Sequence, residues 1–280
     1  MIFNSLKGKC EYYRSREDHR LLPNGHILMM LDGRSFSKLI KNNFEKPFDN
    51  VFIGMMNETA QYLCENISGV KFAYVQSDEI SLYIKDTDKS DPFFGLRSCK
   101  LLSVAASLTT AKFNQLFTHY QLINEINDKN IQDVVSVLDK FENLKLAQFD
   151  CKVWNVPTEN DVYAWFLYRQ LDCIRNSKAQ TAQAYLPHSK LKGLTADEQI
   201  EFLKQEINVD WNKFPADKKF GRVITKETYE ARPTKEVIEK HPEQKDNVSI
   251  RTRWVVSEMS ELTSDEAKQW LFKLINGENV

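Results

Sequence analysis

The chain has 280 residues, with 38 Lys and Arg against 39 Asp and Glu, so its formal net charge is −1. This length fits roughly two domains or one large α/β unit, and the near balance of charge excludes a histone-like polycation but leaves room for a local nucleic-acid-binding patch. Hydrophobic residues make up 42% of the chain, which is ordinary for a packed protein and excludes wholesale disorder.

The cysteines and histidines do not form a recognisable ligand pattern. The five cysteines are scattered without a CxxC pair, and the histidines lack close ligand spacing. This usage argues against a disulfide framework and a zinc ribbon, and it favours a reducing compartment. The N-terminal segment lacks the apolar core of a secretory signal, and its acidic residues are atypical of a transit peptide. We expect a cytoplasmic protein with no membrane partner, an organelle being the alternative compartment.

The hydrophobic pattern of the first 117 residues predicts a strand, two helices, two short strands and a long helix. We expect the strands at 26–31, 72–75 and 80–83, and the helices at 34–40, after Pro47 and at 96–117. This order favours an α+β fold of the ferredoxin-like kind, which is an antiparallel or mixed sheet with helices on one face.

The rest of the chain alternates between polar and strand-forming segments. Residues 119–147 are polar with a helical period, and we interpret them as a helical insertion on the surface. The pattern then predicts a strand over 151–156, a long helix over 159–186, and strands at 220–225 and 250–256. The stretch 211–254 is basic, with 11 Lys and Arg against 7 Asp and Glu.

Carboxylates stand at the ends of two predicted strands. Asp32 closes the first apolar strand, and Asp78 and Glu79 lie in the turn between the next two strands. Alone, each residue would be a turn residue or a helix cap. A buried, unpaired carboxylate is costly, however, so a strand-terminal Asp favours a metal, a cation or solvent. If the two strand ends are neighbours, Asp32 and Asp78 can share two Mg²⁺ ions ~3.5–4 Å apart, an arrangement suited to phosphoryl or nucleotidyl transfer.

The segment after Asp32 is suited to bind phosphate. Gly33 permits close backbone approach and can offer its carbonyl to a metal. Residues 33–37 open a helix, whose free N–H groups attract a triphosphate. Further cationic candidates are Arg34, Lys46, Arg97 and Lys100, although a single surface cation is usually only solvated.

Several blocks of residues stand in the order and approximate spacing of one known superfamily. The blocks are Asp32-Gly33-Arg34-Ser35-Phe36, Lys46-Pro47-Phe48-Asp49, Ser77-Asp78-Glu79, Arg97-Ser98-Cys99-Lys100-Leu101, and Phe149 to Pro157 leading to Tyr168 to Cys173. In these blocks the chain resembles the tRNA-histidine guanylyltransferase superfamily, over roughly residues 10–225.

The resemblance implies a fold and an activity. Residues 1–150 would form a palm like that of polymerases and nucleotide cyclases, and residues 151–280 would continue the palm sheet and add a helical and β-hairpin, tRNA-contacting part. The implied enzyme depends on Mg²⁺, activates a tRNA 5′ end with ATP, and adds GTP or another nucleoside triphosphate in the 3′–5′ direction. The resemblance also implies a homotetramer.

The same motifs imply the site residues. Two Mg²⁺ ions would be held by Asp32, the Gly33 carbonyl and Asp78, with Glu79 as a further catalytic carboxylate. The nucleotide would contact Asp32, Gly33, Arg34, Ser35, Phe36, Ser37, Lys46, Ser77, Asp78, Arg97 and Lys100. We expect the tRNA at Arg169, Arg175, Asn176, Lys218, Lys219 and Arg222.

One departure bears on the branch of the superfamily. Enzymes that add G to tRNA(His) carry a His after the Arg-Gln-x-Asp-Cys segment, whereas Cys173 is followed here by Ile174. This favours the guanylyltransferase-like branch, which repairs truncated tRNA 5′ ends with template-directed nucleotides. The alternatives are a tRNA(His) guanylyltransferase proper, adding G at position −1, a palm-fold nucleotide cyclase, and a non-catalytic tRNA-binding module. The three carboxylates argue against the last of these.

Overall fold

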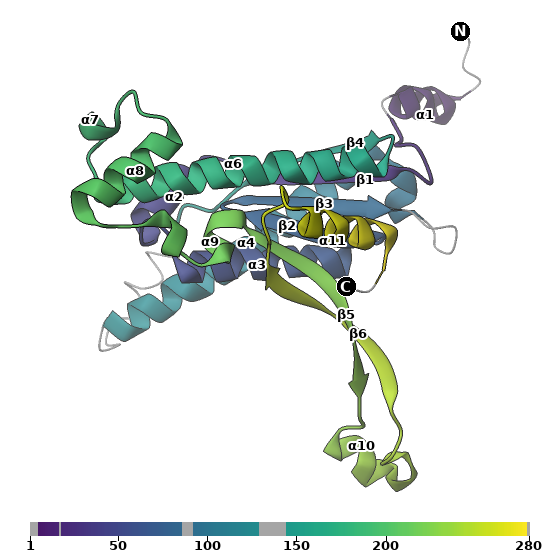
Figure 1. Cartoon of the computed structure of the whole chain (residues 1–280). Helices are drawn as coiled ribbons and strands as arrows, with labels where there is room; N and C mark the ends of the chain where they lie inside the picture. Colours follow the sequence, from purple (N-terminus) through teal and green to yellow (C-terminus); the bar gives the residue numbers. More distant parts are fainter. Residues whose placement is uncertain (1–4, 17, 86–91, 129–143, 279–280) are drawn as a thin grey trace.

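The computed structural model describes residues 5–16, 18–85, 92–128 and 144–278. Its centre is one antiparallel sheet of six strands in the order β4-β1-β3-β2-β5-β6 (Figure 1). The strands are β1 (His26–Gly33), β2 (Val70–Gln76), β3 (Glu79–Lys85), β4 (Phe149–Val156), β5 (Arg222–Ala231) and β6 (Ser249–Glu258). The α+β class and the antiparallel sheet are therefore confirmed, and each predicted strand is present, most of them longer than expected.

The helices differ greatly in length. They are α1 (Leu6–Arg16), α2 (Phe36–Asn43), α3 (Asn50–Asn66), α4 (Ser98–Asp128), α6 (Glu159–Tyr185), α7 (His188–Leu191), α8 (Ala196–Ile207), α9 (Ala216–Phe220), α10 (Lys235–Lys240) and α11 (Asp265–Asn276), with 3₁₀ turns at Phe93–Leu96, Trp211–Lys213 and Pro242–Gln244. In the described part of the chain, none of them is long and apolar enough to cross a membrane.

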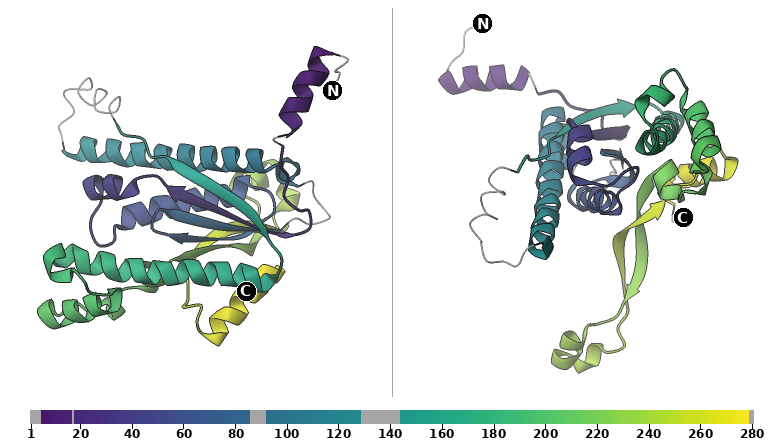
Figure 2. Two further views of the ribbon diagram at one scale, coloured as in Figure 1. Left: turned by 90° about the horizontal axis from the view of Figure 1, so that it is seen from above. Right: turned by 90° about the vertical axis from the view of Figure 1, so that its left-hand side faces the viewer.

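Helices cover both faces of the sheet, which corrects the expectation of helices on one face (Figure 2). Met29 of β1 belongs to a core shared with α3 and α4, whereas Leu28 belongs to a second core with Phe166 of α6 and Leu271 of α11. Neighbouring strand residues point to opposite faces. The five consecutive apolar residues of β1 are therefore the signature of a strand that is buried on both sides.

The long helix α4 extends beyond its predicted end into the segment interpreted as an insertion. The ring of Tyr120 stacks on Phe44 with 5.5 Å between ring centroids, and Gln121 Nε2 donates to Asn43 Oδ1 at 3.0 Å. These contacts with the end of α2 account for the added turns. Of the rest of the expected insertion, residues 129–143 lie outside the described residues, and residues 144–147 are not helical.

The strands β5 and β6 form a hairpin that leaves the body of the protein (Figure 1). Only the base of β5, Arg222 to Thr225, pairs with β2, whereas β5 and β6 pair with each other from Arg222↔Glu258 to Ala231↔Ser249. The outer half is a two-stranded ribbon with α10 at its tip, and Ile250 is 79% exposed on it.

Candidate active site

The carboxylates predicted at the strand ends meet at one end of the sheet. Asp32 of β1 lies opposite Glu79 of β3 and opposite Asp150 of β4 in the strand registers. The Gly33 N–H donates to the carbonyl oxygen of Asp78 at 3.2 Å, which ties the end of β1 to the β2–β3 turn. The structure thus brings Asp32, Asp78 and Glu79 together, as the sequence predicted.

Asp32 and Asp78 are costly to ionise in this position. Burial raises the pKa of Asp78 to about 6, although a hydrogen bond from Ser77 Oγ at 2.9 Å opposes the shift. Burial also raises the pKa of Asp32, and the nearby Asp150 raises it further. Within the described residues, neither carboxylate forms a salt bridge. Two partly buried carboxylates without a salt-bridge partner among the described residues are suited to a bound metal.

The donor chemistry at this point fits Mg²⁺. Asp32, Asp78 and the Gly33 carbonyl supply the hard oxygen ligands that this ion prefers. Among the described residues no group of three or more His, Cys, Asp or Glu side chains is placed to hold a metal. A Mg²⁺ site here would therefore rest on two carboxylates, a backbone carbonyl, and oxygens from substrate and water.

Glu79 has a different environment from the two aspartates. Its side chain is 6% exposed, and Arg169 of α6 donates from Nε to Oε1 at 2.8 Å and from Nη2 to Oε2. Burial raises the pKa of Glu79, and the Arg169 guanidinium opposes that rise. Because both carboxylate oxygens accept from Arg169, Glu79 is a buried ion-pair partner beside the two aspartates.

The segment after Asp32 divides into one core residue and several surface residues. Phe36 is 2% exposed and packs on Phe149 at 4.9 Å between ring centroids, so its side chain belongs to the core. A Cβ on Gly33 would lie 2.4 Å from the Phe36 ring, which explains the glycine. Arg34, Ser35 and Ser37 are exposed at the start of α2 and remain available to a ligand.

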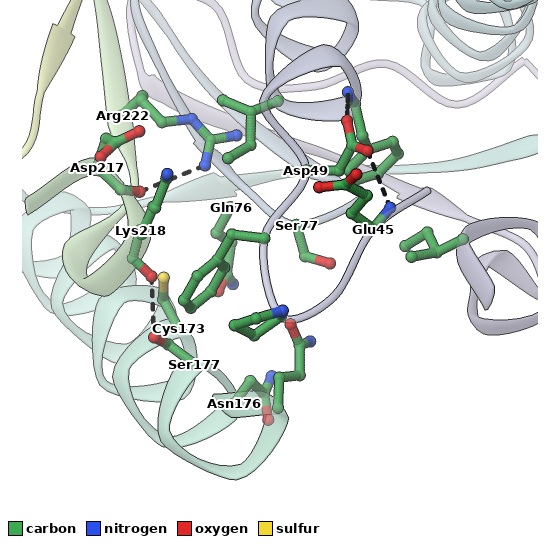
Figure 3. A pocket seen from close by; sticks show the side chains of 16 residues that line it. Glu45, Asp49, Gln76, Ser77, Cys173, Asn176, Ser177, Asp217, Lys218 and Arg222 are labelled. Carbon is green, nitrogen blue, oxygen red and sulfur yellow. Dashed lines mark hydrogen bonds between the residues drawn. The ribbon is translucent and has the colours of Figure 1, made fainter. Parts of the chain in front are cut away.

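A pocket adjoins the Asp78 turn (Figure 3). Gln76 and Ser77 form one wall, Glu45 and Pro47 to Asp49 form another, and side chains of α6 and of the α9 to β5 segment complete it. Asp49 caps α3 by accepting from the N–H groups of Val51 and Phe52. Lys46 is exposed and lies between two residues of the lining. The structure thereby unites the Lys46 block and the Ser77 block at one cavity.

Arg97 and Lys100 lie at the opposite end of the sheet. Leu96 and Leu101 flank them and share a cavity with Ile27 and Ile84, at the start of β1. From there to Asp32 the strand spans roughly 20 Å. Arg97 Nε donates instead to Asp18 Oδ1 at 2.6 Å. Within one chain, therefore, these two cations are not brought to the carboxylates.

The six residues expected to contact tRNA divide by exposure. Asn176 is exposed, the Arg175 side chain is 68% exposed, and Lys218 and Lys219 are half-buried. Arg169 is 9% exposed and pairs with Glu79 and Asp172; Arg222 is 5% exposed and donates from Nε to Asn57 Oδ1 at 3.0 Å. The last two differ from the surface position that a backbone phosphate contact requires. Arg169 is buried against its acidic partners, and Arg222 is buried in the lining of the pocket beside Ser77.

Two acidic residues of the site had no role in the sequence-based interpretation. Asp150 is the second residue of β4 and lies opposite Asp32. Asp172 accepts from Arg169 Nη2 at 3.1 Å and also pairs with Arg175. The position of Asp150, directly before a predicted strand, was the available signal. Asp172 follows Arg169 by three residues, a helical spacing that permits an ion pair.

The comparisons with known proteins give the family. The tRNAHis guanylyltransferase (Thg1) profile matches residues 9–157. This chain belongs to that family. The recognition from the sequence blocks is thus confirmed, and the Thg1 family is represented by relatives across a wide range of organisms.

Two curated relatives illustrate the similarity of this Thg1 family member. The chain is 29% identical to a probable tRNA(His) guanylyltransferase of Drosophila melanogaster over 231 residues, which are 77% of this chain and 72% of that protein. It is also 29% identical to the probable tRNA(His) guanylyltransferase of Mus musculus over 267 residues, or 89% and 82% of the two chains.

Two solved structures of the Thg1 family show the same fold. A bacterial tRNA(His) guanylyltransferase-like protein in complex with ATP aligns with a TM-score of 0.76 at 28% identity, over 97% of this chain and 99% of that one. The tRNA(His) guanylyltransferase of Saccharomyces cerevisiae aligns with a TM-score of 0.60 at 24% identity, over 76% and 91% of the chains. The second likeness concerns the fold alone.

Proposed function

We propose that this family member is a template-dependent 3′–5′ nucleotidyltransferase that adds nucleotides to the 5′ end of truncated tRNA. The observation that carries the proposal is the pair of partly buried carboxylates, Asp32 and Asp78, without a salt bridge in the described residues and beside a pocket reached through Ser77. Such carboxylates suit the metal-assisted transfer of nucleotidyl groups.

Different residues around the carboxylates would bind different parts of the nucleotide. The N–H groups of the first turn of α2 and the side chains of Ser35 and Ser37 would hold phosphate oxygens. The N–H groups of Gly33 and Arg34, which were also expected to bind phosphate, donate instead to the carbonyl oxygens of Asp78 and Gln148. The pocket behind Ser77 would take another part of the nucleotide. The solved bacterial relatives were obtained with ATP and with GTP, which supports nucleoside triphosphates as substrates and ATP as the activator of the tRNA 5′ end.

Mg²⁺ ions at Asp32, Asp78 and the Gly33 carbonyl would polarise the attacking hydroxyl and offset phosphate charge. Lys152 and Arg169 contribute the remaining positive charge, since both act to lower the pKa of Asp32. Arg169 is also the residue that holds Glu79, so a single buried guanidinium anchors one of the three acidic side chains and lowers the pKa of a second.

The repair branch is favoured over addition of G to tRNA(His) by two observations. Ile174 stands where the latter enzymes have a His, and its side chain packs on the core of Ala182, Leu186 and Leu203. A solved bacterial guanylyltransferase-like protein also aligns over 97% of this chain at 28% identity. Base pairing with the opposite strand would then select the nucleotide.

The test uses a tRNA that lacks its first nucleotide, together with Mg²⁺, ATP and each labelled nucleoside triphosphate in turn. We expect incorporation only of the nucleotide that pairs with the template base, in each of four tRNAs that differ at that base. Addition of G regardless of the template would support the tRNA(His) enzyme instead. Release of a cyclic nucleotide without any labelled tRNA would contradict both.

A further inference from the structure

The helix α6 presents an exposed stripe beside the carboxylates. Tyr168 is 58% exposed, Leu171 is 49% exposed, and the side chain of Arg175 is 68% exposed. Residues at i, i+3 and i+7 lie on one face of a helix, so these side chains share one surface. It offers an aromatic ring, an aliphatic side chain and a cation over about 10 Å.

The ring of Tyr168 is held in place by the residues of the active site. The Arg169 guanidinium carbon lies 5.1 Å from the ring centroid, and the Trp165 ring lies 5.9 Å away at an interplanar angle of 53°. Arg169 is itself fixed by Glu79 and Asp172. The Arg169 guanidinium therefore lies between the ring of Tyr168 and the carboxylate of Glu79 as a contact of both. Glu79 in turn lies opposite Asp32 in the sheet.

The charges around the ring suit a nucleic acid. Arg175 is exposed two helical turns further along α6, and Lys152 of the edge strand β4 is exposed and close enough to lower the pKa of Asp32. The ring therefore has one exposed cation on its own helix and another on β4, which packs against α6 through Trp154 and Trp165. Aromatic rings with nearby cations suit single-stranded nucleic acid, because bases stack on the ring and phosphates meet the cations.

We propose that Tyr168 is a stacking platform for the unpaired template base of the substrate tRNA, the base opposite the missing 5′ nucleotide. This inference rests on the proposed function. In a truncated tRNA that base has no pairing partner, so leaving its place in the stack costs less free energy than it would for a paired base. Stacking uses the face of the base and leaves its pairing edge open to the incoming nucleotide. Arg175 then meets a phosphate of the same strand.

The experiment compares Tyr168→Ala and Tyr168→Phe with the wild type. The ligand is a tRNA that lacks its first nucleotide and carries 2-aminopurine as the template base. We expect Tyr168→Ala to raise the Kd for this tRNA roughly 5- to 100-fold, the range for loss of one base–aromatic stack. Tyr168→Phe keeps the ring and should bind within about twofold of the wild type. The 2-aminopurine fluorescence should be quenched by the wild type and by Tyr168→Phe, but not by Tyr168→Ala.

Two controls separate stacking from other effects. Tyr185→Ala removes a second tyrosine of α6, 45% exposed and about 25 Å further along the helix, and should leave the Kd unchanged. Arg175→Ala should reduce the slope of log Kd against log salt by about one, whereas Tyr168→Ala should leave that slope unchanged, because stacking releases no counterions.

Equal Kd and equal quenching in Tyr168→Ala and the wild type would overturn the inference. So would a Tyr168→Phe variant that binds as weakly as Tyr168→Ala, because the hydroxyl and not the ring would then matter. The proposed function fails separately: a wild-type protein that neither binds nor extends the truncated tRNA contradicts it, whereas a wild type that extends the tRNA with no effect of Tyr168→Ala contradicts only the stacking role.

Discussion

Arg169 of α6 forms a bidentate, hydrogen-bonded ion pair with Glu79 of β3, which lies 90 residues earlier in the sequence. The pair joins the helix layer to the strand end that carries the carboxylates. Planar, bidentate pairs of this kind fix orientation as well as charge. The third acidic residue of the Asp32, Asp78 and Glu79 group is therefore anchored by the protein itself, while the other two remain open to a ligand.

Removal of Arg169 should destabilise the protein strongly. Arg169→Ala leaves the buried Glu79 carboxylate without its partner, and we expect the free energy of unfolding to fall by about 3–5 kcal/mol. Urea unfolding would measure this. The double variant Glu79→Gln, Arg169→Ala should lose less than the sum of Glu79→Gln and Arg169→Ala, because neither side chain then remains charged and alone. Strict additivity would contradict the pairing.

Substitution of the open carboxylates should separate activity from stability. We expect Asp32→Asn and Asp78→Asn each to abolish nucleotide addition. Their melting temperatures should equal or exceed that of the wild type in the absence of Mg²⁺, since burial of these charges opposes folding. A variant that keeps more than a few per cent of the activity with ordinary Mg²⁺ dependence would refute the metal assignment.

The lysines at the end of α9 should bind tRNA phosphates. Lys218→Ala combined with Lys219→Ala should weaken tRNA binding and reduce the log–log salt slope by about two. The exposed pair Lys7 and Lys9 of α1 provides a control with the same change of net charge. A tRNA surface elsewhere is indicated if the slope is the same in both double variants. Arg222 is omitted because its side chain is buried.

Arg97 and Lys100 test whether one chain holds the whole nucleotide site. Since they lie roughly 20 Å along the sheet from Asp32, the geometry of a single chain predicts that Arg97→Ala and Lys100→Ala leave the KM for nucleotide unchanged. Steady-state kinetics at saturating tRNA would measure it. A raised KM in both variants would mean that a second copy of the chain supplies these cations.

The pair of Asp18 and Arg97 should make stability depend on pH in the acid range. The hydrogen bond from Arg97 lowers the pKa of Asp18 below its usual 3.8. A carboxyl whose pKa is lower in the folded state stabilises the fold above the unfolded pKa, and this contribution disappears as the pH falls through the lowered value. We expect Arg97→Ala to lower the melting temperature at about pH 6 and to have a smaller effect at about pH 2.5. An equal effect at both values would contradict the pairing.

The sequence predicted the end of the sheet that carries the carboxylates, because each carboxylate lies next to a strand pattern in the chain. Asp32 directly follows an apolar run, and Asp78 lies between two strand patterns, so the strand ends were visible in the order of residues. The blocks around Lys46 and Ser77 meet at one pocket as well. These features depend on strand length and turn position, and both can be recognised from the pattern of apolar and turn-forming residues along the chain.

Other features depend on tertiary packing and were not visible. A helical arginine such as Arg169 is usually exposed, and only the approach of α6 to Glu79 makes it a buried partner. The position of Arg97 depends on how α4 lies along the sheet, which sequence spacing does not specify. Helices on both faces could have been inferred, since the apolar run in β1 does not alternate with polar residues.

The pairing of β2 with β5 has a consequence for how the protein is made. Val75 lies opposite Arg222, about 150 residues later in the chain. At typical rates of synthesis of ~5–20 residues per second, the interval between synthesis of β3 and synthesis of β5 is on the order of ten seconds. The edge of β2 beside the β2–β3 turn is unpaired during that time. Transient protection of this edge by a chaperone would therefore favour the yield of active enzyme more than its final stability.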